Sequence, residues 1–389
     1  SLKYDMPFIP GLSAKVLFSY LTKVEEFKTF AKEFKLYSYD KESGKYNTVF
    51  TGNSPSNLTR KDYTQEQNML QFSLNYNRTF LDKHNVQALF LYEQREDLDD
   101  YLQAYRQFAI DALDQINSGS DKNKNNAGVA SELANASFVG RINYDYASKY
   151  LFEFSFREDG SAKFYKNNRW GFFPGVSAGW IFGREDFIKE AIPVMSFGKL
   201  RASYGINGNA SGIGAYTLQG SYGSSNSNGS FNYNGNTSYL ITELPNPNLR
   251  WEKTATFEVG ADLSFFANRL NTNLTYYNRL TSDKYAALSF PTSTGFSSVT
   301  NNNGEFRNQG IEIELSGKII DSKDWTWSAS GNIAFNKNKI VSLPDNGMER
   351  NRINAFQVYT GNGDEKKWVG GQQEGQEPGI LYLYQADGI

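Results

Sequence analysis

The sequence predicts an all-β protein, an antiparallel transmembrane β-barrel. Two observations support this prediction: apolar and polar residues alternate along many segments, and the connections between those segments are alternately short and long. The alternating run at 254–266 exceeds the roughly five or six residues of an average soluble strand. A tilted strand that crosses a bilayer needs about nine to eleven residues, which these runs can supply.

Each alternating segment has one apolar and one polar face, because successive side chains of a strand point to opposite sides. In 254–266 the apolar face carries Ala255, Phe257, Val259, Ala261, Leu263 and Phe265, and the polar face carries Thr254, Thr256, Glu258, Gly260, Asp262 and Ser264. Eleven segments are candidate strands: 13–22, 70–76, 84–96, 138–146, 152–156, 176–182, 200–204, 254–266, 270–279, 311–319 and 325–335.

The barrel interpretation follows from hydrogen bonding. Lipid cannot satisfy the backbone of a strand, so a membrane sheet closes on itself without a free edge. The apolar row then faces lipid and the polar row faces a wet lumen. The alternative is a soluble β-sandwich in which two apolar faces pack against each other.

The connections favour the barrel. Those at 81–84, 147–149, 267–268 and 321–323 are short, those at 23–66, 98–136, 208–252 and 285–304 are long, and those at 161–169 and 183–196 are intermediate. Outer-membrane barrels combine short periplasmic turns with long extracellular loops.

One segment within a long connection predicts a short helix. Leu98, Tyr101, Leu102, Tyr105, Phe108, Ala109, Ala112, Leu113 and Ile116 recur at spacings of three and four. Asp97, Asp99 and Asp100 suit the N-terminus of this helix, and Asn117 with Gly119 suits its end. We expect the helix to pack over the mouth of the barrel.

Composition excludes several functions. Forty Lys and Arg residues balance 42 Asp and Glu residues, which argues against a nucleic-acid partner. The chain has no cysteine and a single histidine, His84, so neither a thiolate metal site nor a multi-histidine site can form. We therefore predict no enzyme activity, no cofactor and no metal site. No apolar run reaches the length of a transmembrane helix.

Sequence blocks within residues 137–389 are similar to those of a known family. They are FVGRINYDYASKYLFEFSFREDGSAKF, NNRWGFFPGVSAGWIFGREDFIKE, KLRASYGINGN, LPNPNLRWEKTATFEVGADLSFFANRLNTNLTYYNRLTSDKY and NQGIEIELSGKI. In this order they resemble the SusC/RagA family of TonB-linked outer-membrane proteins of Bacteroidetes. The first 136 residues fit the barrel of that family more loosely.

The resemblance implies that residues 1–389 form part of a barrel of about 22 strands, a size whose lumen holds a plug. By this resemblance, we expect residues 1–389 to be an internal part of the barrel, without the plug domain, the TonB-contacting segment (TonB box) and the last barrel strands of the family. The resemblance further implies an outer-membrane importer of glycans or oligosaccharides that is driven by TonB and works with a SusD-like lipoprotein. Alternatives within the same class are a peptide importer and a siderophore receptor. Alternatives of other classes are a plugless structural or adhesive barrel and a soluble carbohydrate-binding protein.

Candidate substrate contacts lie in the long connections. Tyrosine offers a flat face and a hydroxyl to a sugar ring, and the neighbouring Gly, Ser and Asn residues supply adaptable hydrogen bonds. The candidates are Tyr216, Tyr222, Tyr233 and Tyr239 in 208–244, and Trp368. The alternative is a surface loop that binds no ligand, which is the more common role of such loops.

Charged residues of the polar rows are candidates for the lumen. They are Arg141, Arg157, Arg201, Glu258, Asp262, Glu312 and Glu314. These side chains either pair with a plug and line a passage, or simply hydrate an interior that must be polar in any such barrel.

Overall fold

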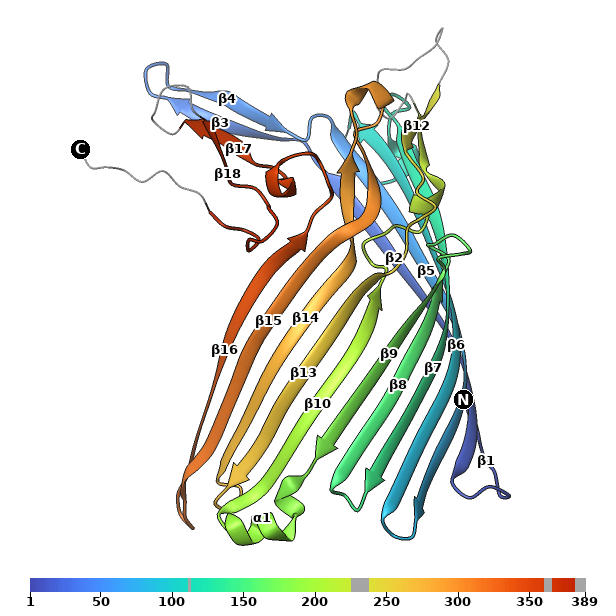
Figure 1. Ribbon diagram of the computed structural model, residues 1–389. Helices are drawn as coiled ribbons and strands as arrows, with labels where there is room; N and C mark the ends of the chain where they lie inside the picture. Colours follow the sequence, from blue (N-terminus) through green and yellow to red (C-terminus); the bar gives the residue numbers. More distant parts are fainter. Residues whose placement is uncertain (111–112, 225–237, 360–365, 382–389) are drawn as a thin grey trace, which may run out of the picture. The chain divides into compact units, whose positions relative to one another are not determined.

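The computed structural model describes residues 1–110, 113–224, 238–359 and 366–381. Its main feature is a twelve-stranded sheet in which the strands lie in chain order (Figure 1). These strands are β1 (Leu2–Asp5), β2 (Leu12–Ala31), β5 (Ser56–Phe80), β6 (His84–Phe108), β7 (Asn125–Tyr146), β8 (Tyr150–Ser161), β9 (Trp170–Trp180), β10 (Met195–Asn209), β13 (Glu252–Phe265), β14 (Leu270–Ser289), β15 (Ser298–Asp321) and β16 (Thr326–Ser342).

Small elements fill the connections. Three hairpins pair β3 (Phe34–Asp40) with β4 (Lys45–Gly52), β11 (Ser221–Ser224) with β12 (Tyr239–Glu243), and β17 (Phe356–Tyr359) with β18 (Lys366–Val369). The α-helix α1 (Asp186–Ala191) is accompanied by 3-10 turns at Ile116–Ser118, Phe182–Arg184, Thr217–Gln219, Thr292–Thr294 and Glu349–Asn351. No helix in the described ranges is long and apolar enough to span a bilayer.

The strand prediction is confirmed. All eleven predicted segments are strands of the main sheet, and β1 is the additional member. The four connections predicted to be short are tight turns that follow β5, β7, β13 and β15. In Figure 1 these turns lie along the lower edge of the sheet, together with α1.

The helix α1 was not predicted, because six residues are too few for helical periodicity to show in the sequence. Glu185, directly before α1, accepts hydrogen bonds from Lys149 Nζ at 2.7 Å, Tyr150 Oη at 2.9 Å and Trp180 Nε1 at 3.3 Å. The hydrogen bond from Lys149 holds the pKa of the Glu185 carboxyl below its usual range. These bonds fix the connection between β9 and β10 against the neighbouring strands.

The chain forms two compact units. The first comprises Ser1–Val16, Phe72–Glu93 and Ala136–Ile389, and the second comprises Leu17–Gln71 and Gln94–Asn135. The second unit contains parts of β2, β5, β6 and β7 with the β3–β4 hairpin, and here the predicted helix at 98–116 is wrong. Residues 98–108 continue β6, which is 25 residues long.

A ladder of side-chain pairs between β5 and β6 explains this correction. Gln67 Nε2 donates to Asp97 Oδ1 and Gln65 Nε2 donates to Asp99 Oδ1, each at 2.8 Å. The ring of Tyr101 stacks on that of Tyr63, 4.6 Å between centroids. From one pair to the next, the residue number rises by two on β6 and falls by two on β5. This is the spacing of neighbouring pairs on one face of an antiparallel sheet. The aspartates therefore serve a strand, although they suit a helix terminus.

In the first unit the pairing is regular along most of the apolar rows for which the register is known. β13 and β14 pair without interruption from Lys253–Ser282 to Phe265–Leu270. Shifts in register between β14 and β15 fall between Thr281 and Tyr285, beyond the apolar row of β14. Those between β15 and β16 lie near the ends of the paired region. The hydrogen-bonded ladder between β13 and β14 is thus unbroken across the apolar rows of these two strands.

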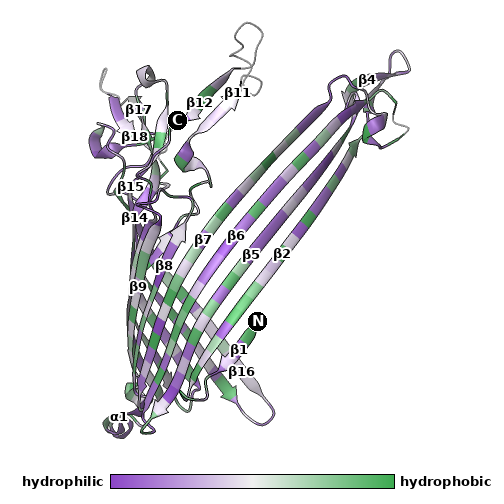
Figure 2. Ribbon diagram, turned by 90° about the vertical axis from the view of Figure 1, so that its right-hand side faces the viewer, coloured by the Kyte–Doolittle hydropathy of each residue, from purple (hydrophilic) through white to green (hydrophobic). Residues whose placement is uncertain are grey.

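The apolar rows lie on the surface of the sheet. Phe257, Ile311 and Phe335 are 44%, 48% and 58% exposed. Figure 2 shows hydrophobic and hydrophilic residues alternating along the same strands. A soluble sandwich would bury such rows against a second sheet. Exposure of these large side chains excludes the sandwich interpretation and leaves lipid as their environment.

Exchanging neighbouring residues for arginine tests the assignment of the two faces. Phe257→Arg places a charge on the apolar face, and we expect it to destabilise the folded protein by about 2–4 kcal/mol at the bilayer midplane and by less toward the interfaces. Thr256→Arg, one residue away on the polar face, should be mild. Urea unfolding of the intact protein in phospholipid vesicles measures both. Equal losses would contradict the assignment.

Candidate functional site

The polar face of the sheet carries a network centred on Arg201 of β10. Its Nη2 atom donates to Thr275 Oγ1 at 2.6 Å and to Asn273 Oδ1 at 3.1 Å, both on β14. Its Nε atom lies 3.3 Å from Asp262 Oδ1 on β13, the strand between them. One guanidinium therefore connects three adjacent strands. It can do so because its donors have a fixed planar arrangement.

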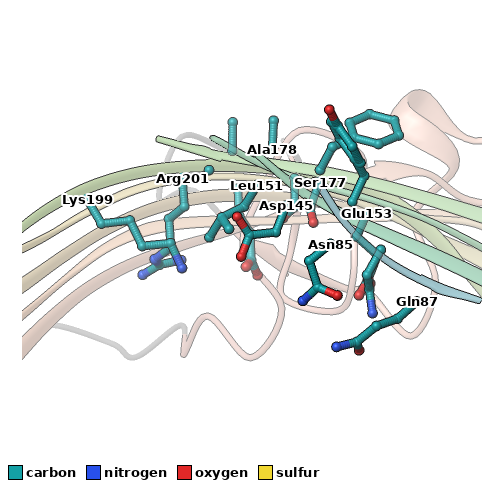
Figure 3. A pocket seen from close by; sticks show the side chains of 16 residues that line it. Asn85, Gln87, Asp145, Leu151, Glu153, Ser177, Ala178, Lys199 and Arg201 are labelled. Carbon is teal, nitrogen blue, oxygen red and sulfur yellow. The ribbon is translucent and has the colours of Figure 1, made fainter. Parts of the chain in front are cut away.

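Further polar side chains surround Arg201 and line a concavity of about 480 Å³. Figure 3 shows Lys199, Arg201, Asp145, Asn85 and Gln87 on the inner side of the curved sheet. Ala178 points to the opposite side (Figure 3). Glu153, Ser177 and Glu258 also line the concavity. The arrangement offers donors and acceptors of both charges to a polar solute, with no nucleophile and base paired for covalent chemistry among them.

A second concavity, of about 1000 Å³, lies along the same face and is lined by Arg141, Arg157 and Glu258. Arg157 Nη2 forms an ion pair with Asp159 Oδ1 at 2.9 Å and lies 3.4 Å from Ser137 Oγ. The two arginines predicted for the polar row of β7 and β8 therefore share one surface with Glu258 of β13.

The register of β14 and β15 places the remaining predicted residues. Glu312 is opposite Thr275, and Glu314 is opposite Asn273. Both acceptor groups of Arg201 on β14 therefore share a face with these glutamates. All seven residues of the predicted polar row lie on one face of the sheet.

The long connection between β10 and β13 is anchored by a small apolar core. Phe164, Ile213 and Leu249 are buried there, and Trp251 and Tyr285 pack against them. These residues come from four separate stretches of the chain. Both ends of the connection are thus fixed at one base.

Beside the apolar core, Glu252 is only 6% exposed. Its carboxylate accepts hydrogen bonds from Asn209 Nδ2 at 2.9 Å and from the backbone N–H of Tyr285 at 2.8 Å. Lys284 Nζ lies 3.7 Å from Glu252 Oε1. The buried charge is therefore compensated by three donors, as a buried carboxylate requires.

Asn302 completes the polar part of this base. Its Nδ2 atom donates to the carbonyl oxygens of Arg250 at 2.8 Å and Asp283 at 2.7 Å, and its Oδ1 atom accepts from the N–H of Arg250 at 2.9 Å. Asp283 has a positive φ of 54° and lies at the register shift of β14. Arg250 Nη2 forms an ion pair with Asp283 Oδ1 at 2.7 Å. The irregular backbone is thus held on both sides.

The described candidates for substrate contact lie in two connections, and two of them share the β11–β12 hairpin. Tyr222 in β11 and Tyr239 in β12 are 71% and 70% exposed, and Tyr216 lies in the same connection next to a 3-10 turn. Trp368 belongs to β18, opposite Gln357, and its carbonyl oxygen accepts a hydrogen bond from Arg352. Tyr233 lies outside the described residues.

The apolar core at Phe164, Ile213 and Leu249 with the adjoining Glu252 and Asn302, here called the loop base, was not predicted from the sequence. Glu252, Asn302 and Tyr285 are far apart in the chain, and none belongs to a motif with recognised chemistry. The usable signal was the NPNLRWE stretch at 246–252, which supplies Leu249, Arg250, Trp251 and Glu252 to the base. Family resemblance marked this stretch without indicating its partners.

A regular antiparallel sheet with a lipid-compatible outer face and a charged inner face defines an outer-membrane β-barrel protein. The family model described as TonB dependent receptor-like, beta-barrel matches residues 16–385. The chain belongs to this family, whose members are outer-membrane receptors and transporters and not enzymes. The resemblance noted from the sequence is confirmed.

Individual relatives support this assignment. TonB-dependent receptor P3 of Formosa agariphila is 33% identical over 325 residues, which cover 82% of this chain and 32% of the relative. TonB-dependent receptor SusC of Bacteroides thetaiotaomicron is 36% identical over 218 residues, covering 53% of this chain and 21% of SusC. The chain therefore spans a third or less of the length of these relatives.

A solved structure has the same fold. The structure of the RagAB peptide transporter superposes with a TM-score of 0.74 at 25% identity, covering 95% of this chain and 38% of the RagAB chain. Because the superposition covers 95% of this chain, it includes most of the first 136 residues, which the sequence blocks match loosely.

Arg201→Gln tests the inner network. It removes the ion pair with Asp262 and leaves the hydrogen bonds to Asn273 and Thr275 without a charged donor. Because the ion pair is partly exposed, we expect the free energy of unfolding to fall by about 1 kcal/mol. Lys199→Gln is the matched control, since it removes a cation two residues away on the same strand and face. It should change stability by less than about 0.5 kcal/mol. Urea unfolding of the intact protein compares them, and an equal effect would refute a specific role for Arg201.

Tyr285→Phe tests the loop base. Burial raises the pKa of Tyr285, which lies beyond the apolar rows, so its hydroxyl stays protonated and donates to the carbonyl of Arg250 at 2.8 Å. Loss of this bond should cost about 1 kcal/mol and speed proteolysis of the 210–251 connection about fivefold, if cleavage requires local opening. Tyr222→Phe, at an exposed tyrosine, is the control. Unchanged cleavage in Tyr285→Phe would show that the base does not restrain the connection.

Proposed function

We propose that the intact protein imports glycans or oligosaccharides across the outer membrane, driven by TonB and assisted by a SusD-like lipoprotein. The observation that carries this proposal is a continuous charged inner face on a barrel wall of the TonB-dependent receptor family. Such a face suits the passage of a polar solute. It does not require any covalent reaction on that solute.

In this proposal the inner face forms the hydrated wall of the passage. It presents cations on β7, β8 and β10 and carboxylates on β13 and β15. The residues are Arg141, Arg157, Arg201, Glu258, Asp262, Glu312 and Glu314. A sugar can exchange hydrogen bonds with such groups one after another as it moves. Arg201 and Asp262 are already paired, so they keep the surface polar without binding a solute too strongly to release it.

The long connections would supply initial recognition. Tyr222 and Tyr239 are the most exposed of the described candidates, and an exposed aromatic ring can stack on a sugar ring. The fixed base at Glu252 and Asn302 would present these rings at low entropic cost. Tyr216, Tyr233 and Trp368 are further candidates of the same kind.

Peptide import is the second candidate, favoured by the fold similarity to the RagAB peptide transporter. Both substrates are polar and both suit a charged wall, but peptides also carry terminal charges that sugars lack. A siderophore receptor and a plugless structural barrel are the remaining alternatives, and the same experiment separates them.

Deletion of the complete gene in the producing bacterium tests the function. We expect loss of growth on specific glycans as sole carbon source, with growth on peptides and under iron limitation unchanged. The intact gene should restore growth, and a version without its TonB-contacting segment should not. Loss on peptides alone would establish the second candidate, loss only under iron limitation would indicate a siderophore receptor, and no transport defect would leave the structural barrel.

Complementation with the double variant Tyr222→Ser/Tyr239→Ser tests the loop contacts within the same strain. The matched control is Tyr39→Ser/Tyr46→Ser, which removes two exposed tyrosines of the β3–β4 hairpin. Loss of two stacking contacts should raise the glycan concentration for half-maximal uptake about tenfold. The control should leave it unchanged. Equal uptake by both variants would remove these tyrosines from substrate recognition.

A further inference from the structure

The outer face of β14, β15 and β16 changes from apolar to polar at one register position. Tyr276, Ile311 and Phe335 form a row of directly opposed residues across the three strands. The next row on the same face, two residues along each strand, is Asn278, Gln309 and Lys337, and the following row is Leu280, Arg307 and Lys339.

The register is uninterrupted through these three rows, so Arg307, Lys337 and Lys339 share the face of Ile311 and Phe335. The inner network of Arg201 lies on the opposite face, because Glu312 and Glu314 alternate with Ile311 and Ile313. The three basic residues therefore point outward. They lie on the side of the apolar band nearer the long connections, which in outer-membrane barrels is the extracellular side.

These cations repel one another. Arg307 and Lys339 are directly opposite on adjacent strands, where like charges destabilise a sheet, and Lys337 lies two residues from Lys339 on the same face. Among the described residues, no carboxylate forms an ion pair with any of the three, and this includes Glu305, the nearest carboxylate along β15. The Nε atom of Arg307 is buried without a hydrogen-bond partner.

We propose that Arg307, Lys337 and Lys339 form an outward-facing site for the phosphate group of an outer-leaflet lipid. A phosphate at this height would neutralise the opposed cations and accept a hydrogen bond from the Arg307 guanidinium. The acyl chains of the same lipid would lie along Tyr276, Ile311 and Phe335 directly below. The combination of a cationic cluster and an adjacent apolar row selects a phosphorylated lipid over a free anion.

The site is independent of the transported substrate, since it lies on the face opposite the inner network. It would act as a lipid anchor that fixes the height and tilt of β14–β16 in the bilayer. Each basic residue near a charged membrane surface contributes about 1 kcal/mol to such attraction.

Binding of a bisphosphorylated, acylated glucosamine disaccharide to the intact protein in phosphatidylcholine nanodiscs tests the proposal. The variant Lys337→Gln/Lys339→Gln removes two cations, and Lys83→Gln/Lys323→Gln removes two from exposed turns at the opposite edge of the sheet. Native mass spectrometry measures bound lipid for each protein, and the heat-modifiable mobility of the barrel on gels confirms that each variant is folded.

We expect the Lys337/Lys339 variant to bind the phosphorylated lipid about thirtyfold more weakly than the unmodified protein and the control variant, the equivalent of about 1 kcal/mol for each cation. The dephosphorylated lipid should bind all three proteins equally and weakly. Equal binding of the phosphorylated lipid by all proteins would overturn the proposal. Displacement of that lipid by inorganic phosphate at equal concentration would also overturn it, because the site would then take a free anion. The proposal would also be overturned if the Lys337/Lys339 variant bound the lipid normally but lost a lipoprotein partner, because these cations would then contact a protein.

Discussion

Backbone hydrogen bonding inside hydrocarbon is the constraint on which this structure depends. A strand that crosses lipid has no water to satisfy an unpaired N–H or C=O, so its ladder must be complete. β13 and β14 meet this condition from Lys253–Ser282 to Phe265–Leu270. The irregular pairing at Asp283 lies beyond the apolar row of β14. There side chains such as Asn302 satisfy the displaced backbone groups.

The same constraint determines how the inner face of the sheet and the long connection between β10 and β13 are held in place. The inner face can carry Arg201 and its partners because a complete ladder leaves every inward side chain available for other contacts. The loop base does the same for the long connection, where Glu252 and Asn302 replace the ladder with side-chain hydrogen bonds. Two different devices therefore position the wall of the sheet and the connection above it.

How much the sequence predicts follows from which interactions are local. Alternation along one strand is local, so the strands and the polar row were predictable from residues such as Glu258 and Phe257. The helix predicted at 98–116 was wrong because Asp97 and Asp99 accept hydrogen bonds from Gln67 and Gln65 on another strand. Residue spacing along one segment does not show such a pairing. The loop base was missed for the same reason, since Glu252 and Tyr285 meet only after the sheet has formed.

The extent of the predicted strands also has a physical meaning. The apolar row read from the sequence begins at Ile311 on β15 and ends at Phe335 on β16, yet β15 begins at Ser298 and β16 continues to Ser342. Ile311 and Phe335 are opposite each other, in the row where the outer face turns polar. Beyond that row the outer face carries polar residues such as Gln309 and Lys337, so an apolar outer row is no longer required while the hydrogen-bonded ladder persists. Apolar alternation in the sequence therefore marks the part of each strand that contacts lipid. The strands continue beyond this part, and for that reason their outer ends were predicted as long loops.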